Sequence, residues 1–191
     1  MAQDNIEVEI KIPLSKKNFL RIKKYLRKST KFVKSSHHID DYYTPKHKSF
    51  LEPEYPFEWL TVRQRNGKIL FNYKHWYPEG IKNTTHCDEY ETEVGNVEQL
   101  EKILTALDFT KILTIDKTRE TYIHKGRLEI ALDFVKNLGY FIEVESLKNL
   151  GGLKKAREEI LEFIKSIGIK ETETVPGGYG GALLRKKGLL K

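Results

Sequence analysis

The stretch that decides the fold lies near the start of the chain and reads Ile6-Glu7-Val8-Glu9-Ile10-Lys11-Ile12. Apolar and charged residues alternate here without a break, and successive side chains of a β-strand point to opposite faces. The pattern predicts one strand with Glu7, Glu9 and Lys11 on a single face. Two carboxylates and an ammonium group on one face form a candidate metal and phosphate site. The alternative is an edge strand whose charged face is solvated, as is common in antiparallel sheets.

Further stretches of the chain repeat this period of two. Asn66-Gly67 lies between two of them and is a strong hairpin-turn signal, because both residues tolerate a positive φ. The alternation therefore predicts a sheet of about eight strands, each with a charged or polar face. The repeating stretches are 60–65, 69–76, 89–94, 114–123, 128–134 and 141–145, and 31–43 reads as an irregular strand.

Three segments instead place apolar residues at helical spacing. Ser15 is expected to cap a helix over 16–28. Asn96, with Gln99 three residues later, resembles a capping box that opens a second helix. A third helix is expected over 152–167. The residues expected to face inward from the second helix are Leu100, Ile103, Leu104 and Leu107.

The strands and helices together favour one architecture. A sheet that curls with its charged faces inside leaves an apolar outer surface for the helices and has no exposed edge. We therefore expect an α+β fold, an eight-stranded antiparallel β-barrel with amphipathic helices packed outside, as a single domain over 1–191. A sandwich with its charged faces in water is the alternative. Segments 44–56 and 176–181 read as loops, the second as a mobile tail before a solvated C-terminus.

Composition narrows the classes of partner and site. The formal charge of +7 suits anionic partners such as nucleic acid, phosphorylated metabolites or polyphosphate, although a soluble basic surface explains it equally well. No apolar run approaches the roughly 20 residues of a membrane span, and the N-terminus lacks the features of a signal peptide. We therefore expect a cytoplasmic protein with no membrane partner. Cys87 is the only cysteine, which excludes an intrachain disulfide and a four-cysteine zinc site.

Sorted by strand face, the expected interior holds an acidic set and a basic set. Buried charges without partners are very costly, so this interior must be wet, internally paired or filled by an ion and an anionic ligand. Carboxylates suit Mg²⁺ or Mn²⁺, and arginines grip phosphate oxygens with two parallel hydrogen bonds. A metal and many cations around one cavity fit a bound triphosphate. The acidic set is Glu7, Glu9, Glu91, Glu93, Asp133, Glu143 and Glu145, and the basic set is Lys11, Arg63, Arg65, Lys74, Lys117 and Arg119.

Seven motifs in order then resemble one known family over nearly the full length. They are Glu7-x-Glu9-x-Lys11, Asp40-Asp41-Tyr42-Tyr43, Val62-Arg63-Gln64-Arg65, Tyr73-Lys74, the run Glu89 to Glu93, Asp116-Lys117-Thr118-Arg119, and the run Leu132 to Glu145, with a weaker match at Gly178-Tyr179. They are similar to the motifs of the CYTH or triphosphate tunnel metalloenzyme superfamily, which includes class IV adenylyl cyclases and thiamine triphosphatases. The first motif alone is weak, whereas seven in the right order are specific. One departure is a glycine before Tyr179, where the family often has a serine.

The resemblance implies a tunnel barrel that binds a triphosphate along its axis with Mg²⁺ or Mn²⁺. By position it implies metal-binding, triphosphate-binding and catalytic roles, with Glu91 and Glu93 as secondary acids. The implied metal ligands are Glu7, Glu9, Asp133, Glu143 and Glu145. The implied triphosphate ligands are Lys11, Arg63, Arg65, Lys74, Lys117 and Arg119, and the implied catalytic residues are Glu7, Glu9, Lys11 and Arg119.

The run of motifs looks nearest to class IV adenylyl cyclase, which converts ATP to cyclic AMP and pyrophosphate. A triphosphatase acting on tripolyphosphate, thiamine triphosphate or a nucleoside triphosphate is the alternative, and a non-catalytic binder of polyphosphate or RNA is a third reading. The expected partner is a nucleotide or another organic or inorganic triphosphate, and a homodimer stays open. Nucleic acid is disfavoured, because no RNA-binding signature accompanies the aromatic residues. His37-His38 is expected to be a surface or partly buried pair and not a metal site, because neighbours on a strand point opposite ways.

Overall fold

The computed structural model describes residues 6–147, 151–169 and 174–190. Within these ranges the chain divides into two compact units, each assembled from separate stretches of sequence. Unit 1 comprises residues 6, 37–116 and 176–190, and unit 2 comprises residues 7–36, 117–147, 151–169 and 174–175. The two units are described separately below.

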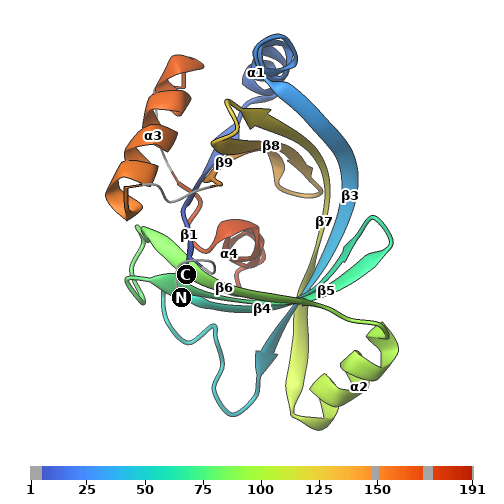
Figure 1. The fold of residues 1–191 in the computed structure, drawn as a ribbon. Helices are drawn as coiled ribbons and strands as arrows, with labels where there is room; N and C mark the ends of the chain where they lie inside the picture. Colours follow the sequence, from blue (N-terminus) through green and yellow to red (C-terminus); the bar gives the residue numbers. More distant parts are fainter. Residues whose placement is uncertain (1–5, 148–150, 170–173, 191) are drawn as a thin grey trace. The chain divides into compact units, whose positions relative to one another are not determined.

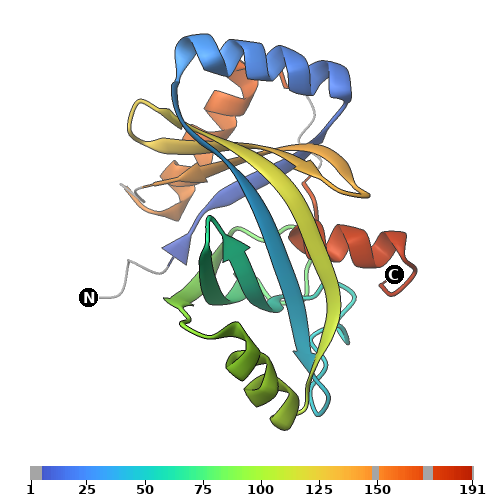
Figure 2. The ribbon, with the colours of Figure 1, turned by 90° about the vertical axis from the view of Figure 1, so that its right-hand side faces the viewer.

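Unit 2 is a sheet covered on one face by two helices. Its strand pairs β2–β9, β7–β8 and β8–β9 are antiparallel. Figures 1 and 2 show α1 and α3 on the same side of these strands. Its elements are β2 (Glu9–Leu14), α1 (Lys16–Ser29), the second half of β7 (Phe109–His124), β8 (Leu128–Val135), β9 (Gly139–Ser146) and α3 (Leu153–Ser166).

The hydrophobic core of unit 2 lies between this sheet and its two helices. Burying a large aliphatic side chain stabilises a fold by about 1.5–3 kcal/mol, so the many side chains gathered here anchor both helices. The helix starts follow the expected chemistry, since the Ser15 hydroxyl accepts a hydrogen bond from the Asn18 N–H at 3.2 Å. The core includes Val8, Ile10, Ile12, Ile22, Leu26, Leu128, Ile130, Leu132, Ile142, Val144, Ile160, Phe163 and Ile164.

Unit 1 is built on the antiparallel pairs β3–β4, β4–β5 and β5–β6. The expected Asn66-Gly67 turn joins β4 to β5, with both residues at positive φ. The Asn96 side chain caps α2 by accepting a hydrogen bond from the Gln99 N–H at 3.0 Å. Its elements are the second half of β3 (Lys31–Pro45), β4 (Glu58–Arg65), β5 (Lys68–Tyr77), β6 (His86–Glu93), α2 (Val97–Ala106), the first half of β7 and α4 (Gly178–Lys186).

The order of strands in the sheet is β1-β6-β5-β4-β3-β7-β8-β9-β2. The first and last strands of this order, β1 (Ile6–Glu7) and β2, are consecutive in the chain with only Val8 between them. The order is therefore that of a nearly closed antiparallel barrel, and the expected α+β class is confirmed. Helix α4 (Gly178–Lys186) differs from the expected outer helices, because Gly180 packs against Tyr42 and Trp59, which share a sheet face with Arg63. The strands number nine because the predicted strand over residues 6–12 is interrupted at Val8, whose carbonyl accepts a hydrogen bond from the Ser146 N–H at 3.0 Å.

Two local predictions were wrong. Ile103 and Leu107 do not pack inward but are more than half exposed, whereas Leu104 is buried. Residues 176–181 are not a loop, because α4 begins at Gly178 and buries both Leu183 and Leu184. A Cβ added at Gly180 would lie 2.8 Å from Tyr42 Cε1, so the glycines that suggested mobility instead allow close helix packing. The loop prediction for residues 176–181 failed because glycine has low helix propensity, and the sequence alone does not show the close packing that offsets it.

The longest described helices, α1 and α3, have 14 residues each and carry many charges. Neither these nor any other helix in the described part of the chain could span a lipid bilayer.

Candidate functional site

Most of the predicted site residues of unit 2 lie on the sheet face opposite its aliphatic core. The alternation of β2 and β9 places Lys11 directly across from Glu143 and Glu9 across from Glu145. The pairing of β7 with β8 places Arg119 across from Asp133. The strand registers therefore gather acids and cations from four strands on one face.

Arg119 is the centre of an ion-pair network on this face. Its Nε and Nη2 atoms donate to the two carboxylate oxygens of Asp133 at 2.8 and 2.7 Å, a bidentate pair. Its Nη2 atom also donates to Glu143 at 3.0 Å. Lys11 Nζ lies 2.9 Å from both Glu9 and Glu143, so Glu143 bridges the lysine and the arginine. Lys117 Nζ lies 3.5 Å from Asp133 Oδ2, so six side chains form one connected cluster.

Electrostatics keep the acids of this cluster ionised. Asp133 is fully buried, and burial alone would raise its pKa. The charges of Arg119 and Lys117 outweigh burial and lower the pKa of Asp133 below its ordinary value. Burial opposes ionisation of Glu143 in the same way, and Arg119 and Lys11 hold its pKa well below the usual range. Both carboxylates are therefore charged at neutral pH.

The donor set of unit 2 fits a hard divalent cation. Its five predicted metal-binding acids exceed its three predicted cations, Lys11, Lys117 and Arg119, by two charges. Oxygen donors with this charge surplus are what Mg²⁺ and Mn²⁺ prefer. Within the described ranges, no three acidic, histidine or cysteine side chains already converge as a metal-binding group. Metal binding would therefore require some carboxylates to exchange a lysine or arginine partner for the ion.

The matching face of unit 1 centres on Arg63. Its Nη1 atom donates to Glu89 at 3.1 Å and to Glu91 at 3.0 Å, and its Nε atom donates to Thr61 at 3.0 Å. The Asn72 amide donates to the same two carboxylates, at 2.7 and 3.2 Å. Burial lowers the pKa of Arg63, but the charges of Asp40 and Glu89 outweigh it and raise the pKa above its ordinary value. Arg63 is thus a permanent cation held by two carboxylates.

The other predicted cations of unit 1 lie nearby. Lys74 Nζ is 3.5 Å from Glu89, and Arg65 Nε is 3.8 Å from the buried Asp40. The structure therefore gathers Arg63, Arg65 and Lys74 on one face, as predicted from the alternation.

Two acids of unit 1 differ from the prediction. Glu93 is exposed and pairs with Lys68 at 2.7 Å, so it does not join the Arg63 group. Glu89 was not singled out, yet it contacts Arg63, Asn72 and Lys74. All three glutamates of β6 share a face, and position along the strand separates them. The signal that could have found Glu89 is its register partner Lys74, since opposite charges across a strand pair attract.

The histidine pair divides as expected for neighbours on a strand. His37 is exposed and its Nε2 atom lies 2.7 Å from Asp116 Oδ1. His38 is buried and lies directly across from Arg65 on β4.

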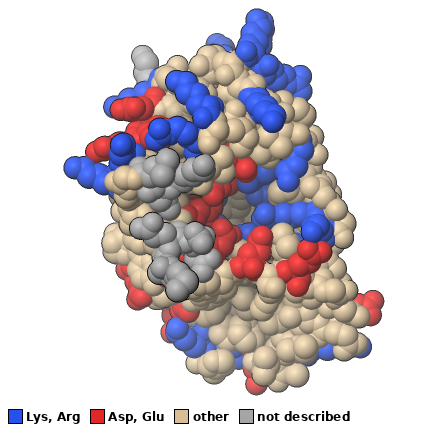
Figure 3. Space-filling view, in the orientation of Figure 1, with Lys and Arg blue, Asp and Glu red and all other residues tan. Residues whose placement is uncertain are grey.

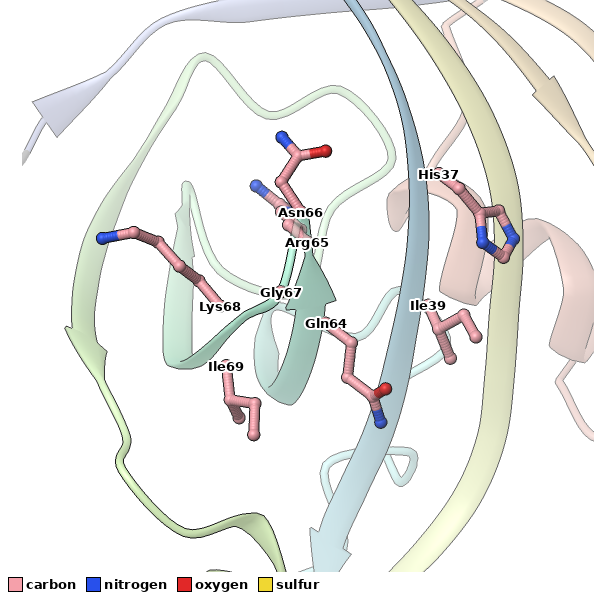
Figure 4. A pocket seen from close by; sticks show the side chains of 8 residues that line it. All are labelled: His37, Ile39, Gln64, Arg65, Asn66, Gly67, Lys68 and Ile69. Carbon is pink, nitrogen blue, oxygen red and sulfur yellow. The ribbon is translucent and has the colours of Figure 1, made fainter.

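A surface cavity near the β4–β5 turn takes in Arg65 but does not form a convergent site. Figure 4 shows Arg65 and Asn66 pointing together while Lys68 points away from them and His37 stands apart on β3. Lys68 is moreover paired with Glu93. Side chains that do not converge cannot bind one ligand atom together, so this cavity is not a candidate ligand site.

The excess positive charge of the chain lies mainly outside the two charged faces. Helix α1 alone carries seven lysines and arginines and no acid. Figure 3 shows Lys and Arg side chains gathered in the part of the surface where Figure 1 places α1. The net charge therefore reflects a solvated helix face more than the candidate site.

Comparisons with known proteins identify the family and the fold of this chain. The CYTH domain model matches residues 5–179. The PH1819 protein of Pyrococcus horikoshii has a similar structure, with a TM-score of 0.76 and 28% identity over 94% of this chain and 99% of that one. A candidate adenylate cyclase of Vibrio parahaemolyticus gives a TM-score of 0.73 at 19% identity, over 95% of this chain and 99% of that one.

A Hippeastrum protein described as a candidate adenylyl cyclase with a dominant triphosphatase activity gives a TM-score of 0.65 at 17% identity, over 97% of each chain. The last two likenesses show the fold alone, because their identity is low. No curated protein sequence matches the chain significantly. The family model spans nearly the whole chain and its charged strands, and on that ground this protein belongs to the CYTH domain family.

Proposed function

We propose that this protein is a divalent-metal-dependent enzyme that acts on a triphosphate, with conversion of ATP to cyclic AMP and pyrophosphate as its reaction. The observation that carries the proposal is the buried cluster of unit 2, in which Asp133 and Glu143 stay ionised beside Arg119 and Lys11. Charges are retained in such a place at high cost, so a ligand-binding role explains them better than stability does.

The residues of unit 2 are assigned to metal and charge. Glu7, Glu9, Asp133, Glu143 and Glu145 would hold Mg²⁺ or Mn²⁺. A bound ion of this kind supplies Lewis-acid polarisation of phosphate oxygens. When carboxylates turn to the ion, the cations Lys11, Lys117 and Arg119 become available to phosphate oxygens. Glu7, Glu9, Lys11 and Arg119 are the residues to which we assign catalysis.

The residues of unit 1 are assigned to phosphate binding. Arg63 offers a planar fork of donors that matches phosphate oxygens, and Arg65 and Lys74 add charge. Phosphoryl transfer needs little covalent help from a protein, since its catalysis is mainly positioning and neutralisation of charge. Attack of the ribose 3′-hydroxyl on the α-phosphorus releases pyrophosphate and closes the cyclic product.

Hydrolysis is the second candidate, because the structurally similar Hippeastrum protein is described as having a dominant triphosphatase activity. In this reaction water attacks the γ-phosphorus and the products are orthophosphate and a diphosphate. The same charged residues serve either reaction. The nucleophile alone distinguishes them.

One experiment separates these functions. The purified protein is incubated with Mg²⁺ or Mn²⁺ and with ATP, tripolyphosphate or thiamine triphosphate, and the products are separated by chromatography. Cyclic AMP with pyrophosphate is the expected outcome with ATP, and orthophosphate would favour the hydrolase. Absence of turnover with every substrate and metal would contradict an enzyme and leave a binder of polyphosphate.

The matched variants are Glu9→Gln and Glu159→Gln. Glu9→Gln removes one charge from the buried cluster, and turnover is expected to fall by at least about 100-fold, the scale seen when one transition-state interaction is lost. Glu159 forms an ion pair with Arg127 on the helix-covered side of unit 2 and serves as the control. Equal activity of both variants would contradict the assignment of Glu9.

A further inference from the structure

His37 and His38 are chemically identical neighbours with opposite surroundings. The His37 side chain is 57% exposed, whereas His38 is only 4% exposed. Both belong to β3, whose alternation turns one imidazole to each face of the sheet. His38 is therefore a buried imidazole on one face, and the exposed His37 on the opposite face can serve as its experimental control.

The face that His38 shares is the phosphate-binding face assigned to unit 1. The register of β3 and β4 sets His38 directly across from Arg65, and Asp40 directly across from Arg63. Directly opposed residues in an antiparallel pair have Cβ atoms about 4.5–5.5 Å apart. His38 thus continues the row of side chains that includes both arginines.

Burial here calls for a reason beyond packing. An imidazole carries an N–H donor in every protonation state, and burying a polar ring costs more than burying an aliphatic side chain of similar size. An imidazole N–H donor in a row with two arginines can hydrogen-bond an anionic oxygen.

We propose that His38 contacts the phosphate chain of the substrate by donating a ring N–H to a phosphate oxygen beside Arg65. This inference rests on the proposed function and adds an imidazole N–H donor to its set of cations. The recognised chemistry is a terminal or internal phosphate oxygen of a triphosphate, whatever organic group is attached. His38 is thereby a substrate-binding residue and not a metal ligand.

The test compares His38→Leu, His38→Gln and His37→Leu. Leucine fills a similar volume but has no donor, whereas the glutamine amide restores one. With ATP and Mg²⁺, His38→Leu is expected to raise KM for ATP about tenfold with a smaller change in kcat, the scale of one hydrogen bond to a charged group. His38→Gln is expected to recover at least half of that loss on a logarithmic scale, and His37→Leu to match the wild type. If His38→Leu does not fold, His38→Ala is measured in its place.

A second readout keeps this inference separate from the proposed function. The rise in thermal unfolding temperature with added tripolyphosphate is measured for all variants, and His38→Leu is expected to show the smallest rise. Equal KM values and equal ligand-induced shifts in the two leucine variants would overturn the role of His38 alone. A lowered unfolding temperature without change in KM or ligand-induced shift would show a structural role and overturn it too. A wild-type protein with neither turnover nor a ligand-induced shift would overturn both this inference and the proposed function.

Discussion

The charged faces of units 1 and 2 arise from the same alternation but reach different electrostatic states. In unit 2, Arg119 makes a bidentate pair with a carboxylate that is fully buried. In unit 1, Arg63 is shared between Glu89 and Glu91, whose side chains are 25% and 34% exposed. Water near these glutamates makes their bonds to Arg63 easier to exchange. The difference suggests a division of labour, in which the buried acids of unit 2 serve a cation and the exchangeable arginine of unit 1 serves phosphate.

The largest expected effect follows from removing an acid of unit 2. Asp133→Ala leaves Arg119 and Lys117 buried without their main partner, and we expect a loss of about 3–5 kcal/mol in the free energy of unfolding. The matched control is Glu159→Ala, because Glu159 also makes a two-bond pair with an arginine, Arg127, at 2.7 and 2.9 Å. That pair is partly exposed, so its loss should cost no more than about 1 kcal/mol.

Urea denaturation measures both variants. Equal losses of unfolding free energy would mean that burial does not set the cost of removing an acid from the charged face of unit 2.

Lowering the pH is expected to have the next largest effect on the free energy of unfolding. The pKa values of Asp133 and Glu143 are lower in the folded protein than in the unfolded chain, so their contribution is fully present above about pH 5 and is lost as the pH falls through the folded values. The pKa of Asp133 falls to about 2 in the folded protein, which corresponds to roughly 2–3 kcal/mol. Urea denaturation at pH 6 and pH 3 should reveal this loss.

Both tryptophans, Trp59 and Trp76, lie in unit 1, so their fluorescence reports on that unit, while circular dichroism reports on both. If acid weakens unit 2 first, the dichroism signal changes at a higher pH than the fluorescence signal. The reverse order would contradict the stronger electrostatic coupling of unit 2.

A smaller effect tests the phosphate role of unit 1. Arg63→Lys keeps the charge but removes the planar fork, and KM for the triphosphate should rise about tenfold, or about 1.4 kcal/mol. Steady-state kinetics checks this, with Arg127→Lys as an equivalent change in an arginine outside the proposed site. A rise in KM in both variants would indicate a general effect of the substitution and not a phosphate contact.

The smallest expected effect concerns α4 of unit 1. In Gly180→Ala the new Cβ would lie 2.8 Å from Tyr42 and 3.2 Å from Trp59, which should cost about 1–3 kcal/mol and be offset by about 1 kcal/mol of helix propensity. Gly95→Ala is the control, because its Cβ would meet no atom within 4 Å. Thermal unfolding of both variants checks the prediction. A more stable Gly180→Ala would show that α4 is loosely packed.

The sequence predicted the charged faces because their determinants are local. Alternation fixes which residues share a face, and this was enough to group Lys11 with Glu9 and Arg63 with Arg65. It was not enough to separate Glu89 from Glu93, because exposure along β6 depends on where its neighbouring strands end. The register that places Glu89 opposite Lys74 depends on pairing between strands, which alternation within one strand does not specify.

The C-terminal region shows the same limit. Glycines have weak helix propensity, but the small size of Gly177 and Gly180 allows close approach to Trp59 and Tyr42, and that of Gly181 to the Pro176 carbonyl. Tertiary packing therefore overrode local propensity. The positive net charge suggested an anionic partner, but much of it comes from α1, which lies in neither charged face.

The pairing of β2 with β9 has a consequence for how the chain folds. Strand β2 pairs with β9, which lies about 130 residues later in the sequence, so residues 9–14 have no β9 to pair with while the chain is being synthesised. Contacts of such large sequence separation form late and slow folding, because the intervening chain must first be ordered. This pairing brings Lys11 to Glu143 and sets Glu9 across from Glu145, so the candidate metal site would be completed only as the molecule finishes folding.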